Sequence, residues 1–135
     1  LLAGASTARA SPRSVDVTTV DAIIDAQGWE RVDFLKVDAE GNDLRVLEGA
    51  ARALSEQRIG LVQFEYNSSW SQAGSTLSMA YRLLEQSGYS VFLLKGPKLY
   101  LFRHDVDGEF FHYSNFVAVS PSMMSLFEEC DVVAI

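Results

Sequence analysis

Apolar and polar positions divide most of the chain into two kinds of segment. One kind consists of short runs with the apolar or β-branched content of strands, bounded by turn-forming residues. These runs are residues 15–20, Val32–Val37, Ile59–Tyr66 and residues 89–94. The run Val32–Val37 is mostly apolar, which is typical of an interior strand in a parallel sheet. The pattern therefore predicts a largely buried sheet.

Segments with helical spacing lie between these runs. The helices are expected over residues 18–27, 42–56 and 76–87. Thr18 and Asp21 resemble a capping box at the start of the first helix, and Asn42 is placed to cap the second. Gly49 lies inside the second helix, where glycine costs about 1 kcal/mol relative to alanine, so we expect this helix to approach the sheet closely. The order β-α-β-α-β-α-β predicts an α/β fold whose sheet is parallel at first.

The C-terminal third has a different pattern. A Gly-Pro turn at residues 96–97 and an Asp-Gly turn at residues 107–108 bracket a short apolar run. Residues 110–120 follow with no predicted helix before them, so we expect this end of the sheet to be antiparallel. A short terminal helix is expected over residues 122–129. The fold class is thus α/β, with parallel strands closed by an antiparallel hairpin.

The composition narrows the possible functions. The 135 residues include 11 basic and 18 acidic side chains, and the formal net charge of −7 argues against nucleic acid or an anionic membrane as a partner. Cys130 is the single cysteine, which excludes an internal disulfide and a cysteine-based zinc site. No apolar run approaches the roughly 18 residues that span a bilayer. We therefore expect a cytoplasmic protein with neither nucleic acid nor a membrane as its partner.

The stretch most informative about chemistry is FLKVDAEGNDLRVLEGA, residues 34–50. An apolar strand runs directly into Asp38 and Glu40, and ligands of open α/β sheets bind outside the carboxyl ends of the strands. Lys36, Asp38 and, if the extended chain continues, Glu40 point to one side. A structural alternative stays open, in which Lys36 forms an ion pair with one of these carboxylates while Asp38 or Asn42 caps the helix.

The next strand also ends in polar side chains. Glu65 and Asn67 are expected beside Asp38, across the crevice between the strand ends. Oxygen atoms of these three residues suit a hard divalent cation, but we do not expect a metal there. Tyr66 and Trp70 lie near the same mouth and are candidates to line a ligand pocket. The alternative for Trp70 is that it packs the loop against the sheet.

Residues 34–50 resemble the signature segment of FkbM-type methyltransferases, which reads apolar–Leu–Lys–Ile/Val–Asp–x–Glu–Gly–x–Glu–x–x–Val–Leu–x–Gly–Ala. The residues that match it are Leu35, Lys36, Val37, Asp38, Glu40, Gly41, Val46, Leu47, Gly49 and Ala50. Asp43 stands where the pattern has Glu. The upstream VTTVDAIID and the downstream LVQFEYN, which contains Glu65, are also similar to the family. The resemblance covers residues 15–119.

This resemblance implies a Rossmann-like class I methyltransferase sheet that uses S-adenosylmethionine. The expected reaction transfers the methyl group to a hydroxyl or amine of a sugar or small natural product. On this basis Asp38 and Glu40 are the expected catalytic residues, and Asp38 also binds the cofactor. The residues expected to bind the substrate are Glu65, Tyr66, Asn67 and Trp70. The family order also predicts that residues 116–119 insert antiparallel between Ile59–Tyr66 and residues 89–94.

The resemblance also indicates that part of the fold lies elsewhere. Class I methyltransferases grip the cofactor with a glycine-rich turn after their first strand, whereas no two of the nine glycines here lie within three residues of each other. The chain begins with neither methionine nor the apolar region of a signal peptide. We therefore expect the N-terminal cofactor-binding half upstream of residue 1 and an inactive 135-residue fragment. The expected parts are a lead-in at residues 1–14, the matching region at 15–119, and a terminal helix and tail at 120–135.

Two other functions stay open. Asp38 and Glu40 imitate the metal-binding Asp-x-Asp pair of a nucleotide-sugar glycosyltransferase, although such an enzyme does not need the Leu-x-Gly-Ala helix that follows. A non-catalytic α/β interaction module is the second alternative. His104 and His112 flank the late turn, far from the motif, and are expected to be surface or hairpin residues.

Overall fold

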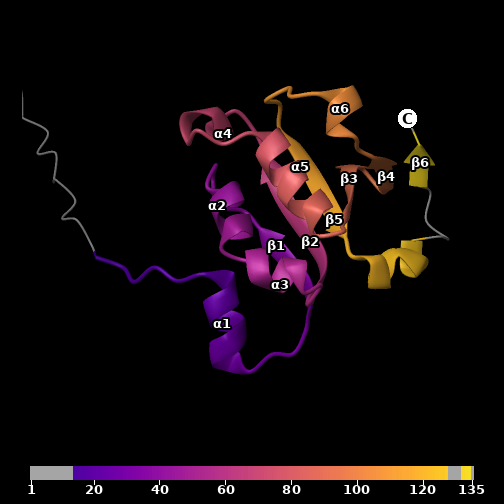
Figure 1. Cartoon of the computed structure of the whole chain (residues 1–135). Helices are drawn as coiled ribbons and strands as arrows, with labels where there is room; N and C mark the ends of the chain where they lie inside the picture. Colours follow the sequence, from indigo (N-terminus) through magenta and orange to yellow (C-terminus); the bar gives the residue numbers. More distant parts are fainter. Residues whose placement is uncertain (1–13, 128–131, 135) are drawn as a thin grey trace, which may run out of the picture.

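The computed structural model describes residues 14–127 and 132–134. Within these residues the strands are β1 (Val32–Val37), β2 (Ile59–Tyr66), β3 (Ser90–Lys95), β4 (Lys98–Leu101), β5 (Ser114–Val119) and β6 (Val132–Ala134). The helices are α1 (Val20–Gln27), α2 (Asp43–Glu48), α3 (Ala51–Ser55), α4 (Ser69–Gln72), α5 (Leu77–Gln86), α6 (His104–Asp107) and the 3-10 helix η1 (Pro121–Phe127). Figure 1 shows α4 and α6 near one end of the sheet and α2, α3 and α5 over one of its faces.

The described strands form one six-stranded open sheet in the order β1-β2-β5-β3-β4-β6. β1 and β2 are parallel, with Val37 opposite Phe64. β5 runs antiparallel between β2 and β3, so that Phe116 lies opposite Phe64 on one side and Leu93 on the other. β6, which the sequence pattern does not predict, pairs parallel to β4. The α/β class, the parallel β1–β2 pair and the antiparallel insertion of residues 116–119 are confirmed.

Side chains alternate between the two faces of this sheet. On β2, Val62, Phe64 and Tyr66 are fully buried on the face that α2, α3 and α5 cover. Leu61 and Glu65 point to the opposite face and are partly exposed. That face holds a smaller apolar cluster, which includes Leu61 and is covered by η1. The helices therefore cover one face thickly, whereas the opposite face is covered only in part among the described residues.

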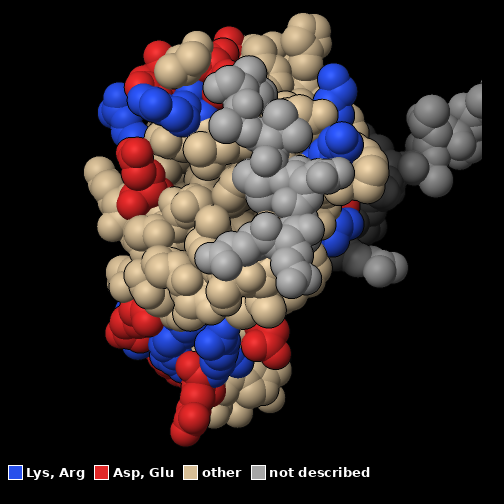
Figure 2. All heavy atoms as spheres, turned by 90° about the vertical axis from the view of Figure 1, so that its right-hand side faces the viewer, with Lys and Arg blue, Asp and Glu red and all other residues tan. Residues whose placement is uncertain are grey.

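Charged side chains are spread over the side of the molecule that carries β4 and β6. Figure 2 shows one mixed group toward the top and one toward the bottom, and further Lys or Arg side chains along the right-hand edge. Lys or Arg and Asp or Glu occur in both groups. No single sign of charge therefore dominates the part of this side that the figure shows.

The first strand predicted from the sequence does not form. Residues 14–19 adopt neither helix nor strand, and their two valines are 77% and 91% exposed. β-branched residues favour strands where they pack on a half-buried sheet surface, and this segment has no such surface among the described residues. The cap of α1 also differs from the prediction. Thr19 rather than Thr18 caps this helix, and its hydroxyl accepts the Ala22 N–H at 3.1 Å.

The long helix expected over residues 42–56 is divided into α2 and α3. The division lies at Gly49, whose carbonyl accepts the Asp21 N–H at 2.9 Å. Asp21 in turn caps α3, because its carboxylate accepts two backbone N–H groups in the first turn, at 3.0 and 2.9 Å. A Cβ at Gly49 would lie 3.3 Å from the Cβ of Thr19. The close approach at this glycine therefore involves the start of α1 and not the sheet.

The C-terminal third is antiparallel up to β5, but it contains elements that the sequence pattern does not show. β3 and β4 form the expected hairpin around the Gly-Pro turn. α6 lies between β4 and β5, where no helix is predicted, and α4 follows β2. Each spans four residues, which is too short for an apolar periodicity to reveal. η1 replaces the first part of the expected terminal helix, and residues 128–129 and Cys130 lie outside the described residues.

Glu109 ties the end of β2 to the start of α5. Its carboxylate accepts the Leu77 N–H at 2.8 Å and the Ser78 N–H at 3.1 Å, and the Tyr66 hydroxyl also donates to it. His104 Nε2 lies 3.3 Å from the same carboxylate. Burial raises the pKa of Glu109, but these hydrogen bonds outweigh burial and lower its pKa overall. Burial and the bond to Glu109 raise the pKa of Tyr66.

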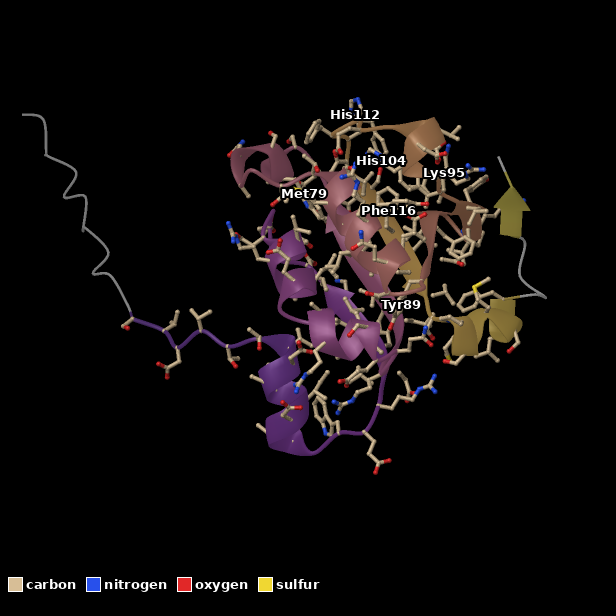
Figure 3. The ribbon with its side chains drawn as sticks, viewed as in Figure 1. Met79, Tyr89, Lys95, His104, His112 and Phe116 are labelled. Carbon is tan, nitrogen blue, oxygen red and sulfur yellow. The ribbon has the colours of Figure 1, made fainter. Side chains whose placement is uncertain are left out.

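The two histidines differ in their surroundings. His104 is partly buried beside Glu109, whereas His112 is exposed. Figure 3 shows both at the end of the sheet near α6, with Tyr89 at the opposite end. There the Tyr89 hydroxyl donates to the Ile59 carbonyl, and burial raises the pKa of Tyr89 to about 12. A buried tyrosine thus anchors α5 to the sheet at each end.

Glu109→Gln should lower the free energy of unfolding at neutral pH by about 1–3 kcal/mol, because an NH₂ group replaces one of the oxygens that accept N–H groups. A lowered pKa in the folded state means that the ionised carboxylate stabilises the fold above its unfolded pKa of roughly 4.3. This stabilisation is lost as the pH falls through the folded pKa. The difference between wild type and variant should therefore shrink on going to about pH 3.

Urea unfolding at neutral pH and at about pH 3 measures this difference. Glu48→Gln, at an exposed position on α2, is the control and should change stability little at either pH. If Glu109→Gln lowered the free energy of unfolding equally at both pH values, the result would contradict the role of the ionised carboxylate.

Asp21→Ala should lower the free energy of unfolding by about 1–2 kcal/mol, because two N–H groups of α3 lose their acceptor. Asp16→Ala is the matched control, since Asp16 is exposed in residues 14–19. It should change stability by less than about 0.5 kcal/mol. Thermal unfolding measures the loss of stability in both variants. If Asp21→Ala and Asp16→Ala lost the same free energy of unfolding, the Asp21 cap would be dispensable.

Candidate functional site

The carboxyl ends of β1 and β2 lie at the same end of the sheet, because the two strands are parallel. Lys36 is opposite Gln63 in the β1–β2 pair. Asp38 and Glu65 each follow two residues later, so strand alternation places their side chains on the same face of the sheet. Lys36 Nζ lies 3.2 Å from Asp38 Oδ2, and the two side chains are 56% and 47% exposed. The ion pair considered as a structural alternative therefore forms, and Asp38 is still accessible to solvent.

The loop after β1 turns sharply at Glu40 and Gly41. Their φ angles are 52° and 97°, in the left-handed region that favours glycine. The extended chain does not continue to Glu40, so the strand alternation that would place Glu40 beside Asp38 ends before it. Glu40 is exposed. Its position is set by the shape of this loop and not by the strand.

Asp43 holds this loop from the inside. Its side chain is buried, and its carboxylate accepts the Gly41 N–H at 3.1 Å and the Ala39 N–H at 3.4 Å. Asn42, the expected cap of α2, makes no side-chain capping bond. Asp43 is a residue of this site that the sequence reasoning missed. The only signal was its position within the motif, because its contacts with the loop depend on the fold.

Glu65 and Asn67 form a hydrogen-bonded pair at the end of β2. Asn67 Nδ2 donates to Glu65 Oε1 at 2.9 Å, and Asn67 Oδ1 accepts the Ser69 N–H at 2.8 Å. Asn67 therefore links the Glu65 carboxylate to the first residue of α4. This arrangement orients the carboxylate and leaves its second oxygen without a protein partner among the described residues.

Asp38 and Glu65 form a row of polar side chains across β1 and β2, and Asn115 on β5 extends this polar row to a third strand. It lies opposite Glu65, and its side chain accepts a hydrogen bond from Gln63 at 3.1 Å. Within residues 14–127 and 132–134, no hydrogen bond or ion pair joins Asp38 or Glu40 to Glu65. The structure therefore brings the two strand ends to one edge but does not bond their carboxylates together. Such carboxylates can accept hydrogen bonds from hydroxyl or ammonium groups of a ligand, and can accept a proton.

Tyr66 and Trp70 are both fully buried. Their rings lie 5.2 Å apart in an edge-to-face arrangement, and Trp70 Nε1 donates to the Glu65 carbonyl at 3.0 Å. These contacts pack α4 against the sheet, which is the alternative considered for Trp70. Both side chains are shielded from solvent here, and contact of either with an acceptor stays a prediction.

Two surface hollows have volumes in the range of small-molecule sites. One of about 360 Å³ is lined by residues 93–96 and 113–115, and it includes Asn115 of the polar row. The other, of about 420 Å³, lies between α5 and α6. Its wall includes His104 and the Arg103–Asp105 ion pair, whose charged groups lie 2.9 Å apart. The hydrogen bond from Arg103 lowers the pKa of Asp105. A molecule in the first hollow would meet the polar row at Asn115.

Two further findings concern ligands and membranes. In the described part of the chain, no group of three or more His, Cys, Asp or Glu side chains is placed to hold a metal ion. The helices of that part are all too short or too polar to cross a bilayer.

Comparison with protein families matches this chain to the methyltransferase FkbM domain over residues 3–91. That is more than half of the 135 residues, and it includes β1, the loop after it, and β2. The match ends within β3, earlier than the resemblance to residue 119 read from the sequence. Comparisons with curated proteins and with solved structures gave no match. The extent of the family match shows that this chain belongs to the FkbM methyltransferase family.

Proposed function

We propose that this protein transfers the methyl group of S-adenosylmethionine to a hydroxyl or amine of a sugar or small natural product. Family membership supports methyl transfer in general. The observation that supports this particular site is the register that places Asp38 and Glu65 on one face, at the carboxyl ends of adjacent parallel strands. In open α/β sheets, ligands bind outside the carboxyl ends of the strands.

Asp38 is the proposed contact to the cofactor. S-adenosylmethionine supplies an electrophilic methyl group, and it also carries ribose hydroxyls and an ammonium group. An ionised carboxylate only accepts hydrogen bonds, so it suits those hydroxyl and ammonium groups. Asp38 is about half exposed, and Lys36 occupies only one of its oxygens. These features fit a residue that holds a polar part of the cofactor.

Other residues must hold the remaining part of the cofactor. No two of the nine glycines lie within three residues of each other, so a paired-glycine turn is not encoded in these 135 residues. Backbone N–H groups at such a turn are well suited to an anionic group of a ligand. We therefore infer that the 135 residues alone do not bind S-adenosylmethionine at micromolar concentration.

Glu40, Glu65 and Asn67 are proposed to act on the acceptor. Transfer forms a bond from the acceptor oxygen or nitrogen to the methyl carbon while the sulfur–carbon bond breaks, and the acceptor loses a proton. Glu40 is exposed and has no hydrogen-bond or ion-pair partner among the described residues, so its carboxylate is free to take that proton. Glu65, oriented by Asn67, has a free oxygen with which to position the acceptor.

Titration calorimetry of the full-length gene product with S-adenosylhomocysteine tests the cofactor assignment, and we expect one site per chain. Release of S-adenosylhomocysteine from S-adenosylmethionine then tests the transfer with three acceptors: a methyl glucoside, an amino sugar and a secondary alcohol. Binding of a nucleotide sugar with Mn²⁺, and none of S-adenosylhomocysteine, would support a glycosyltransferase instead.

Asp38→Asn and Glu40→Gln should each lower turnover at least tenfold, equivalent to about 1.4 kcal/mol of transition-state stabilisation. Both side chains are exposed, so the free energy of unfolding should change by less than about 0.5 kcal/mol. Asp33→Asn is the matched control, because Asp33 is an exposed carboxylate on β1 with one ion pair to Arg31. Full turnover in both variants would show that Asp38 and Glu40 are structural residues.

A further inference from the structure

Asp43 is a buried carboxylate next to an exposed active-site loop. It is only 1% exposed, although it is the first residue of α2. Burial of a charged group is costly unless hydrogen bonds compensate it. Here the compensation comes from the loop itself, since one carboxylate oxygen accepts the Gly41 N–H and the other accepts the Ala39 N–H. Asp43 thus binds the two backbone groups on either side of Glu40.

The loop needs such support because its conformation is strained. Glu40 has a φ of 52°, which a residue with a Cβ adopts at a cost in free energy, and Gly41 follows with a φ of 97°. A strained backbone persists only where its surroundings hold it in place. The two hydrogen bonds to the Asp43 carboxylate are such a support, since they hold the backbone on both sides of Glu40.

Gly41 is held from the other side by α4. A Cβ at Gly41 would lie 2.7 Å from the Cβ of Ser69, so only glycine fits against this helix. The Ser69 N–H donates to Asn67, and Asn67 donates to Glu65. A continuous series of contacts therefore runs from Asp43 through Gly41 and Ser69 to Asn67 and Glu65. It joins the end of β1 to the end of β2, although the carboxylates themselves are not bonded.

We propose that Asp43 is a positioning residue, whose buried carboxylate fixes the loop of residues 38–41. In this conformation Asp38 and Glu40 face the proposed ligand site at the carboxyl ends of β1 and β2. Asp43 acts through these exposed residues and does not touch the cofactor or the acceptor. This inference rests on the proposed function for the role of Asp38. That Asp43 fixes the loop rests only on the contacts of the loop and not on the proposed function.

Asp43→Asn is the sharpest variant, because it keeps the shape of the side chain. Its amide presents an NH₂ group to one of the two backbone N–H groups, which loses its acceptor. Hydrogen exchange at the amide that loses its acceptor, Ala39 or Gly41, should become at least tenfold faster. Asp33→Asn, on the exposed side of β1, should leave both amides unchanged.

A double-mutant cycle with Asp38 shows whether Asp43 works through it. S-adenosylhomocysteine is the probe, and calorimetry on the full-length gene product measures its Kd. Asp38→Asn and Asp43→Asn should each weaken binding about tenfold. The double variant should be close to tenfold weaker, and not the hundredfold expected of independent residues, because a misplaced Asp38 has no contact left to lose.

Additive losses would overturn the proposal, because they would show that Asp43 acts independently of Asp38. Unchanged exchange at Ala39 and Gly41 in Asp43→Asn would overturn it as well. If Asp43→Asn does not fold, Gly41→Ala replaces it in the same cycle, since its methyl group displaces the loop from the α4 side. A wild type that does not bind S-adenosylhomocysteine contradicts the proposed function and the inference that rests on it. That failure is distinguishable, because it is seen in the wild type before any variant is compared.

Discussion

The insertion of β5 between β2 and β3 is the constraint on which the other features of this fold depend. β5 pairs with two strands that run parallel to each other, so it must return from the loop beyond α6 before the sheet can form. Phe116, at its centre, stacks on Phe64 with ring centroids 5.4 Å apart and meets Phe102 edge-on at 5.0 Å. Aromatic rings bury large apolar areas, so these contacts stabilise a pairing that joins distant parts of the chain.

The same return path positions the helices above the sheet. The loop that leads into β5 carries Glu109, and pairing of β5 with β2 brings Glu109 to the Tyr66 hydroxyl. From there the carboxylate accepts the first N–H groups of α5, which orients this helix over β2. An acidic group at a helix N-terminus is favourable because it satisfies unpaired N–H groups and the helix dipole. One carboxylate thus connects a strand, a loop and a helix.

At the carboxyl ends of β1 and β2, exposed and buried residues of the motif have different surroundings. Asp38 and Glu40 are exposed to solvent, whereas Asp43 is buried and accepts hydrogen bonds from the backbone on both sides of Glu40. The end of β2 shows the same division, since the Glu65 side chain is partly exposed while Trp70 is buried and packs α4 against the sheet. The groups that hold this part of the chain are thus shielded from water.

The sequence by itself determined the elements whose residues carry local signals. The apolar content of β1 and β2, the turn dipeptides of the β3–β4 hairpin, and the motif around Asp38 are all local, and the family order placed β5. Where an element depends on contacts with a distant segment, the prediction from the sequence was wrong. Residues 14–19 have the composition of a strand but no neighbouring strand in the described chain, and the 42–56 helix divides because Asp21 caps its second half.

Only the tertiary structure decided what surrounds each polar side chain. Strand alternation correctly placed Asp38 on one face with Lys36, but the left-handed turn at Glu40 depends on contacts with α2 and α4. The burial of Asp43 and Trp70 likewise arises from packing between segments that are separate in the sequence. Local sequence specifies the path of the backbone over a few residues, whereas burial and hydrogen-bond partners come from segments that meet only when the chain folds.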